Sequence, residues 1–516
     1  MKPASLLSTA MLLAAAPSVI AIPLTSSGTK KDSIDLDNEE YIVVLKAEET
    51  RSWTHVFADM GFNDTKRHTQ NGAISTHGVK SGITYATKHG VKLRTFGNSF
   101  RAFTMKMPKS HSVDLLSMPS IAFLEKNNIR SKQMPHRPNS KRATHGAMRR
   151  VPRGVDDWKG RRFDIIKRQE LIDGSSPHNR TMPTIGLIPV NGTVPTNGTR
   201  PTTGHTLILQ NTAPWNLQRI SSAHSIPADG RRITELTYKY RFDSTAGKGV
   251  DAYIIDSGIY TSHPDFQGRA EMIYSAFDDD GEDGDGHGTH VAGTVGSLTY
   301  GVAKNVNLLG CKVLDDTGDG SDAAIAAGID AALASHMKRK NKPGFVGSVM
   351  NLSLGSPKQS QVLYAVLKRA ADAGMHIAVA PGNDNKDACT DFPAGYNKKI
   401  PSLFVVGASD IDDLRADFSD NGPCVDLHAP GVGIVSSTID GKHASKEGTS
   451  MATPAVVGVI AAELSKNPQF KLDPIGMKKH ILSLAEKGVL KTKPNDDALN
   501  GGMVLLNTGF PGDPSA

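Results

Sequence analysis

The sequence holds only three cysteines in 516 residues, and beyond the first 21 residues it has no apolar run long enough to cross a membrane. Three cysteines exclude a disulfide framework, although they are compatible with one bridge and one free thiol. A multi-spanning membrane protein is excluded as well. The other totals, with 50 Gly, 29 Pro and 22% charged residues, are those of a globular chain with room for more than one domain.

Positive charge is concentrated in one stretch of the chain. The formal net charge is +7, yet residues 131–212 alone carry 14 Lys and Arg against 5 Asp and Glu. The rest of the chain is therefore close to neutral. A basic excess confined to a Pro/Gly-rich stretch is typical of a linker, so the composition predicts no nucleic-acid partner.

The amino-terminus has the pattern of a secretory signal. Lys2 precedes an apolar run from Leu6 to Ile20, and small or moderate residues follow it. We expect residues 1–21 to be a signal peptide, because the run is shorter than the ~20 residues that a membrane anchor needs. The expected destination is extracellular, with the vacuole as the alternative. The chain also contains four Asn-x-Ser/Thr sequons, which predict glycosylation at Asn63, Asn179, Asn191 and Asn197.

Two regions precede the main part of the chain. Residues 22–130 contain strand-like runs at 41–46 and 100–107 and two helical stretches, which predicts a small α+β domain. Residues 131–211 lose this periodicity and carry dibasic pairs, so we expect a flexible linker that is removed. These pairs are candidate cleavage sites, and a merely solvated basic stretch is the alternative.

From residue 212 to residue 516, buried-looking strands alternate with helical segments. This alternation predicts an α/β fold with a mostly parallel sheet, in which functional residues gather at the carboxyl ends of the strands. The clearest strands end near Asp256, Leu314, Ser353 and Ala380.

Two polar motifs lie where such strands and helices meet. Asp256 ends the strand Tyr253-Ile-Ile-Asp256, and an aspartate there can hold an imidazole in one tautomer. His287 lies at a loop-to-helix junction and can act as a general base, whereas His290 is one turn further and should pack. A metal site at the two histidines or a calcium loop in residues 278–286 are alternatives, but neither pattern is complete.

Two further motifs supply a hydroxyl and an amide. Ser450, in Glu447-Gly-Thr-Ser450, follows a glycine turn at the start of a helix, whose NH groups favour negative charge. Asn383 follows a buried strand and offers a hydrogen-bond donor. Taken singly, Ser450 reads as part of a helix cap and Asn383 as a turn residue.

Jointly and in this order, Asp256, His287, Asn383 and Ser450 resemble the subtilisin family of serine endopeptidases, and more closely its proteinase K branch. The resemblance implies a three-layer α/β fold over residues 212–516, preceded by an inhibitor-like propeptide domain. In that family's arrangement Ser450 would attack the substrate carbonyl, His287 would move the proton, and Asp256 would orient His287. Asn383 and the backbone NH of Ser450 would bind the oxyanion.

The same resemblance implies further sites. Gly318-Asp319-Gly320 would be an edge strand to which an extended peptide adds. The pocket for the residue before the cleaved bond would be lined by Ser353-Leu354-Gly355 and Ala380-Pro381-Gly382. Pro381 replaces a smaller residue of the family and could narrow the pocket. Cys389 and Cys424 would form a disulfide and leave Cys311 free. The carbonyls of Pro401 and Leu403 with the Asp426 carboxylate would hold a structural calcium ion. Asn351 opens a sequon too, but it should be buried and unmodified.

The expected function is that of a secretory-pathway serine endopeptidase with broad specificity, made as a self-inhibited zymogen whose linker is cut near Gln210. Its partners would be protein and peptide substrates and its own propeptide, with no membrane span and a monomeric state. Catalysis would need no cofactor. The alternative is a catalytically silent protein that uses the same groove for peptide binding. A kexin-type enzyme is disfavoured because only 66 residues follow Ser450.

Overall fold

The computed structural model describes residues 38–60, 62, 66–68, 84–86, 92–96, 100–135, 187–190, 206–277, 279–492 and 503–510. The expected signal peptide and most of the expected linker lie outside these residues. So do the four sequons at Asn63, Asn179, Asn191 and Asn197. In the described part, no helix is both long and apolar enough to pass through a bilayer.

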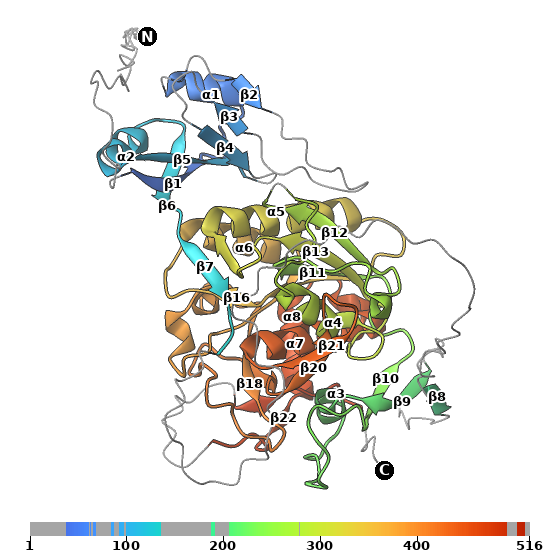
Figure 1. Ribbon diagram of the computed structural model, residues 1–516. Coiled ribbons are helices and arrows are strands. Elements are labelled where there is room, and N and C mark those ends of the chain that lie inside the picture. The colour runs from blue at the N-terminus through green and yellow to red at the C-terminus, as the bar shows by residue number, and fades with distance from the viewer. Residues whose placement is uncertain are drawn as a thin grey trace, which may run out of the picture.

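A small α+β unit, which we call the amino-terminal unit (residues 38–128), stands apart at the top of the molecule (Figure 1). Alternate residues of its first strand, β1, face opposite sides, as a pleated strand requires. Val43 faces the core of the unit, whereas Ile42 and Val44 face the rest of the protein. Its antiparallel sheet has the order β2-β3-β4-β5-β1-β6. The elements are β1 (Asn38–Leu45), α1 (Trp53–Asp59), β2 (Lys66–His68), β3 (Thr84–Ala86), β4 (Lys92–Phe96), β5 (Ala102–Pro108), α2 (Lys109–Leu116) and β6 (Ile121–Lys126).

The main body (residues 206–510) is built on a nine-stranded sheet with the order β12-β13-β11-β15-β17-β18-β19-β23-β22. All neighbouring pairs are parallel except β22 with β23. The mostly parallel sheet predicted from the sequence is confirmed. Its strands are β11 (Val250–Asp256), β12 (Ala270–Ser275), β13 (Asn307–Lys312), β15 (Gly347–Leu352), β17 (His376–Val379), β18 (Leu403–Ser409), β19 (Leu427–Pro430), β22 (Glu486–Lys487) and β23 (Val504–Leu505).

Helices cover both faces of this sheet and make three layers (Figure 1). Strand β11 is buried at all seven positions, because Ala252 and Ile254 pack in one core and Tyr253 and Ile255 in the other. A parallel strand between two helical layers is apolar on both faces for this reason. The first core contains α4 (His287–Gly296), α7 (Thr449–Lys466) and α8 (Pro474–Leu484), and the second contains α5 (Asp322–Arg339) and α6 (Gln361–Asp372).

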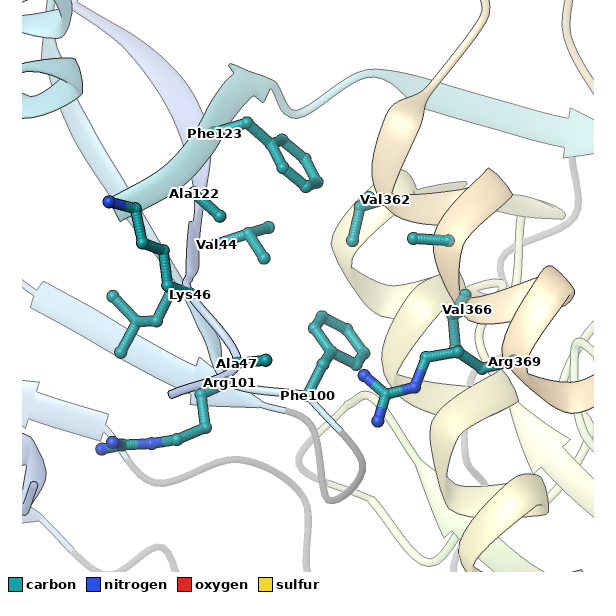
Figure 2. A pocket seen from close by; sticks show the side chains of 12 residues that line it. Val44, Lys46, Ala47, Phe100, Arg101, Ala122, Phe123, Val362, Val366 and Arg369 are labelled. Carbon is teal, nitrogen blue, oxygen red and sulfur yellow. The ribbon is translucent and has the colours of Figure 1, made fainter. Parts of the chain in front are cut away.

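The amino-terminal unit packs on α5 and α6. Phe100 and Phe123 from the unit and Val366 from α6 line a cavity of about 330 Å³ between the two parts (Figure 2). Polar contacts beside the cavity fix the orientation of the amino-terminal unit on α5 and α6. Glu125 accepts hydrogen bonds from the first turn of α6, one of them from the Gln361 NH at a distance of 2.7 Å. The side-chain oxygen of Asn127 accepts a hydrogen bond from the Ala323 NH of α5 at 3.0 Å. A carboxylate at a helix amino-terminus also interacts favourably with the helix dipole.

Both ends of the stretch that the sequence predicted as a linker lie in strands. Strand β7 (Ile129–Lys132) leaves the amino-terminal unit and lies between β14 (Asp319–Ser321) and β16 (Leu354–Gly355) of the main body (Figure 1). At the other end of this stretch, the segment near Gln210 does not lie between β14 and β16. It is part of β9 (Leu207–Ala213), which pairs with β8 (Leu187–Val190) and β10 (Tyr238–Asp243). The sequence analysis assigned none of these four strands, β7 to β10.

The remaining elements of the main body are short. They are the helix α3 (Trp215–Ile220), the hairpin β20 (Ile434–Ser437) and β21 (His443–Lys446), and single 3-10 turns at Pro264–Phe266, Ala388–Thr390, Ala394–Tyr396 and Pro468–Phe470.

Candidate active site

The chain that follows β7 passes directly over Ser450. The Lys132 NH donates to the Gly318 carbonyl at 2.9 Å, and the Gln133 NH donates to the Ser353 carbonyl at 3.1 Å. The Ser450 hydroxyl in turn donates to the Gln133 carbonyl oxygen at 2.5 Å. Backbone pairing therefore places the peptide group after Gln133 next to the hydroxyl.

Asp256 and His287 form the first part of the site. Asp256 ends β11 and His287 begins α4, and His287 Nδ1 lies 2.7 Å from Asp256 Oδ1. Both side chains are buried, and the Ser257 NH also donates to Asp256 Oδ1 at 2.8 Å. The carboxylate fixes the imidazole with Nδ1 toward Asp256. His287 Nε2 has no hydrogen-bond partner among the described residues, so it is available to receive a proton.

Ser450 lies at the amino-terminus of α7, after Gly448. Gly448 has a φ of 145°, and a Cβ atom built on it would lie 3.1 Å from the Gln133 carbonyl oxygen. A larger residue would strain the backbone and meet the bound segment. The Ser353 hydroxyl donates to the Ser450 carbonyl at 3.0 Å and so ties this turn to the segment after β15.

Asn383 presents a free donor beside this turn. Its Oδ1 accepts from the Thr449 NH at 2.8 Å, and its Nδ2 has no partner among the described residues although the side chain is only 6% exposed. The bond to Thr449 fixes which side of the amide is the donor. A buried, unpaired NH2 group beside a helix amino-terminus is suited to a developing oxyanion.

Sequence comparison identifies the family of the chain. The profile described as the subtilase family matches residues 247–506, which include Asp256, His287, Asn383 and Ser450. The chain belongs to the subtilase family. Among similar proteins, Alkaline protease 2 of Aspergillus fumigatus is 42% identical over 57% of this chain and 61% of its own length. Subtilisin-like protease 3 of Saccharomyces cerevisiae is 42% identical over 57% of this chain and 63% of its own length. This subtilase thus aligns with less than two thirds of the length of these relatives.

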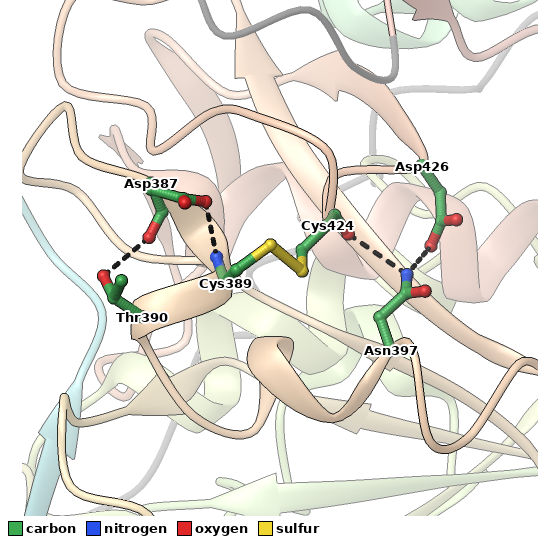
Figure 3. Close-up of a disulfide and its surroundings, with 6 residues drawn as sticks. All are labelled: Asp387, Cys389, Thr390, Asn397, Cys424 and Asp426. Atoms are coloured by element: carbon green, nitrogen blue, oxygen red, sulfur yellow. Dashed lines mark hydrogen bonds between the residues drawn. A yellow bond between two sulfur atoms is a disulfide. The ribbon is translucent and has the colours of Figure 1, made fainter.

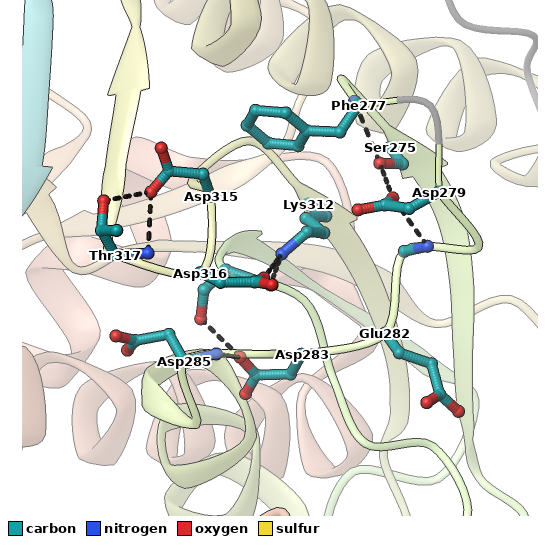
Figure 4. Close-up of polar contacts among 12 residues, drawn as sticks. Ser275, Phe277, Asp279, Glu282, Asp283, Asp285, Lys312, Asp315, Asp316 and Thr317 are labelled. Atoms are coloured by element: carbon teal, nitrogen blue, oxygen red, sulfur yellow. Dashed lines mark hydrogen bonds and ion pairs between the residues drawn. The ribbon is translucent and has the colours of Figure 1, made fainter. Parts of the chain in front are cut away.

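Asp283 organises the loop before His287 in this subtilase, and the sequence analysis gave it no role. Figure 4 shows it on that loop, near Lys312 and Asp316. Its carboxylate accepts hydrogen bonds from the Ser257 hydroxyl and, on the loop and α4, from three backbone NH groups at 2.8–3.2 Å and the Thr289 hydroxyl at 2.6 Å. These bonds fix the start of α4 against the end of β11. The acidic loop is thus held by its own hydrogen bonds, and its carboxylates need no ion for this purpose.

His290 packs, as the sequence predicted. Its Nε2 lies 3.1 Å from both the Ile434 and the Ala444 carbonyl oxygens, and burial holds its pKa well below the usual value. Within the described residues, no group of three or more His, Cys, Asp or Glu side chains could hold a metal ion.

Two of the three predicted substrate-binding segments of this subtilase contact the bound chain. Gly318-Asp319-Gly320 and Ser353-Leu354-Gly355 contribute β14 and β16, the two partners of β7. At Gly355 a Cβ atom would lie 2.5 Å from Gln133 Nε2 and 2.7 Å from Asp391 Oδ1, so the missing side chain makes room for the Gln133 amide. Burial raises the pKa of Asp391 to about 7. Ala380-Pro381-Gly382 follows β17, and the Gly382 carbonyl accepts from the Thr449 hydroxyl at 3.2 Å.

The structure contains the disulfide that the resemblance implied. Cys389 and Cys424 are bridged with Cα atoms 5.3 Å apart, and Cys311 is free and buried. Figure 3 shows Asn397 beside the bridge, donating to the Cys424 carbonyl at 3.1 Å and to Asp426 Oδ2 at 2.8 Å. The bridge therefore anchors the loop that carries Asp391 and Phe392. Asn351, the sequon on β15, is fully buried as expected.

A lysine occupies the position expected for calcium. The Lys478 ammonium donates to the Leu403 carbonyl at 2.5 Å and lies 2.7 Å from Asp426 Oδ1. The expected calcium ligands were Pro401, Leu403 and Asp426. Two of them, Leu403 and Asp426, already bind the Lys478 ammonium. A divalent ion and an ammonium group would repel one another at this distance, so these residues do not fit calcium.

We expect Lys478→Ala to lower the apparent melting temperature by several degrees at a fixed scan rate. Burial lowers the pKa of Lys478 and raises that of Asp426, and their mutual contact opposes both shifts. Removing one partner of a buried pair leaves the other charge uncompensated, which costs about 3–5 kcal/mol. The neighbouring exposed Lys479 provides the control, and equal melting temperatures for Lys478→Ala and Lys479→Ala would contradict the expectation.

Proposed function

We propose that this subtilase is a serine endopeptidase that is made as a self-inhibited zymogen. The observation that carries the proposal is the contact between the Gln133 carbonyl and the Ser450 hydroxyl. The hydrogen bond that holds His287 on Asp256, and the unpaired Asn383 donor beside Thr449, support it. The alignment covers only part of the relatives, so their activities support the proposal and do not replace a direct test.

The proposed reaction gives each of these groups one role. Ser450 Oγ attacks the carbonyl carbon of the peptide group, and its proton passes to His287 Nε2, whose imidazolium the Asp256 carboxylate stabilises. The carbonyl oxygen becomes negative and accepts hydrogen bonds from Asn383 Nδ2 and the Ser450 NH. His287 then gives the proton to the leaving amine, and water repeats the sequence to release the acyl group. All groups required are side chains or backbone of this chain, and the proposed cycle uses no cofactor.

Self-inhibition has a direct explanation in the bound segment. Ile129 to Gln133 pair with both sides of the groove, so no other peptide can enter while they remain. The Ser450 hydroxyl donates to Gln133 and to the Ser353 carbonyl at 3.1 Å, and it makes no hydrogen bond to His287 Nε2 in this state. We therefore assign the first cut to the bond between Gln133 and Met134, and we expect a later cut to remove the linker near residue 212.

The proposed route is the secretory pathway, ending outside the cell or in a vacuole. The signal-like amino-terminus supports it, and so does the Cys389–Cys424 bridge, because disulfides persist mainly in oxidising compartments. The substrates would be proteins and peptides held as an added strand, and backbone pairing of that kind accepts many sequences.

Labelling with a fluorophosphonate tests the proposed activity. In the matured protein the probe should phosphonylate Ser450 with loss of fluoride, because only an activated hydroxyl reacts at neutral pH. Mass spectrometry of the digested protein locates the modified residue. A protein that binds peptides without cleaving them would stay unlabelled at Ser450, and that result would contradict the proposal.

A further inference from the structure

The bound segment identifies which side chain occupies which part of the groove. The Gln133 carbonyl lies at Ser450, so Gln133 is the residue before the proposed cleaved bond, Lys132 is the second and Arg130 is the fourth. The strand pairing agrees with this assignment, because Arg130 stands opposite Gly320 and Lys132 opposite Leu354.

Arg130 is enclosed almost completely by the main body. It is 1% exposed, and its Nε contacts the Asp322 carboxylate, which is fully buried at the start of α5. The other two nitrogens reach backbone oxygens: Nη1 donates to the Phe392 carbonyl at 3.1 Å, and Nη2 donates to the Lys358 carbonyl at 2.8 Å. The pocket thus offers acceptors on three sides of a flat group, which matches the fork of donors on a guanidinium.

The neighbouring positions of the segment also meet carboxylates. The Ser131 hydroxyl donates to Asp319 Oδ1 at 2.5 Å, and the Lys132 ammonium contacts Asp285 on the loop before His287. The aliphatic part of Lys132 lies where a side chain on Gly318 would be, because a Cβ there would lie 2.6 Å from Lys132 Cδ. Figure 4 shows Asp285 on the loop beside Asp283. The Lys132 side chain is 27% exposed, so its ion pair contributes less than that of Arg130.

We propose that the pocket closed by Asp322 is a substrate subsite that selects arginine at the fourth residue before the cleaved bond. This inference rests on the proposed function. A neutral side chain there would leave the Asp322 carboxylate sealed without a cation, and an unpaired buried charge is strongly unfavourable. A lysine would place a compact ammonium where three separated acceptors require a planar fork. The preferred substrates are thus proteins that carry Arg-x-Lys ahead of the cut, with arginine dominant.

The chain itself contains this pattern once. Arg130-Ser131-Lys132 is the single place in the full sequence where an arginine is followed two residues later by lysine or arginine. The dibasic pairs of the expected linker, such as Arg149-Arg150, lack that spacing. The selectivity would therefore direct the first cut to the end of the amino-terminal unit and away from the linker.

Hydrolysis of a peptide series by the matured enzyme tests the subsite. Internally quenched peptides with the sequence of residues 129–136 would carry arginine, lysine, citrulline, norleucine or alanine at the second position of the peptide. Citrulline keeps the shape of arginine and removes its charge. Because hydrogen bonds between charged groups are the strong ones, we expect kcat/KM for arginine to exceed that for citrulline by about 10- to 100-fold.

Two variants assign the preference to a residue. Asp322→Asn should bring the arginine-to-citrulline ratio toward unity, whereas Asp319→Asn, which changes the neighbouring rim carboxylate, should keep it. A ratio near unity in the wild-type enzyme would overturn the subsite, and this result does not depend on whether Asp322→Asn folds. A ratio preserved in Asp322→Asn would overturn the role of Asp322. Hydrolysis of the alanine peptide without arginine preference would leave the proposed function standing, whereas failure to cut any peptide would overturn both.

Discussion

Replacing Ser450 with alanine is expected to leave the full-length chain uncut between Gln133 and Met134. The alanine has no oxygen to attack the Gln133 carbonyl that now lies 2.5 Å from the hydroxyl. The loss of a serine nucleophile lowers kcat by about 10⁶-fold, while the oxyanion donors and the groove preserve a small residual rate. The amino-terminal unit should therefore remain covalently attached and continue to fill the groove.

Mass spectrometry of the purified chain measures this outcome directly. Ser465→Ala is the matched control, because Ser465 lies near the other end of the same helix and donates to the Ala461 carbonyl at 3.2 Å. That variant should mature as the wild type does. If Ser450→Ala is processed normally after Gln133, another protease makes the cut. If it also hydrolyses peptides at the wild-type rate, Ser450 is not the nucleophile.

The residues that carry the proposed chemistry could be predicted because each stands where a strand or helix begins or ends. Asp256 ends a fully buried strand, and Asn383 follows another one. His287 begins α4 directly after Gly286, and Ser450 lies in the first turn of α7 after Gly448. In a parallel sheet, the carboxyl ends of the strands meet at one edge. Taken singly, Asp256, Asn383 and Ser450 favoured a turn or a cap, so the assignment of the catalytic roles rested on the joint resemblance of the motifs to the subtilisin family.

The contacts of the bound segment could not be predicted in this way. Arg130 and Asp322 are 192 residues apart, and each alone reads as a solvated charge at the end of an element. The groove recognises the segment through its backbone, and backbone pairing of this kind requires no pattern of apolar residues. For this reason the sequence placed residues 131–135 in a linker, although they lie in or beside the groove.

Long-range polar contacts likewise escaped the sequence analysis at the expected calcium site. The prediction rested on one carboxylate and two carbonyl groups, and the Lys478 ammonium comes from α8, more than fifty residues after Asp426. A buried lysine is uncommon unless it is paired. Lys478 of α8 reaches the Leu403 carbonyl of β18 only in the folded protein, so the sequence does not reveal that a lysine provides the cation at this site.

Asn383→Asp is expected to lower kcat by about 10²- to 10³-fold, which is the effect of removing one oxyanion donor. The substitution keeps an oxygen that accepts from the Thr449 NH, now at 2.8 Å, and replaces the unpaired NH2 group with a second oxygen. The developing oxyanion would then meet a negative group in place of a donor. Steady-state kinetics on a peptide substrate measures kcat and KM separately.

Separate values of kcat and KM distinguish binding of the oxyanion by Asn383 from a structural role of this residue. The donor acts on charge that appears only in the transition state, so kcat should fall while KM and the melting temperature change little. Asn385→Asp makes the same chemical change two residues away, where the Asn385 oxygen accepts from Arg415 Nη1 at 2.9 Å and from Asn421 at 3.1 Å. That control should retain its kcat. An unchanged kcat in Asn383→Asp, or an equal loss in both variants, would show that the amide of Asn383 positions the turn before α7 and does not bind the oxyanion.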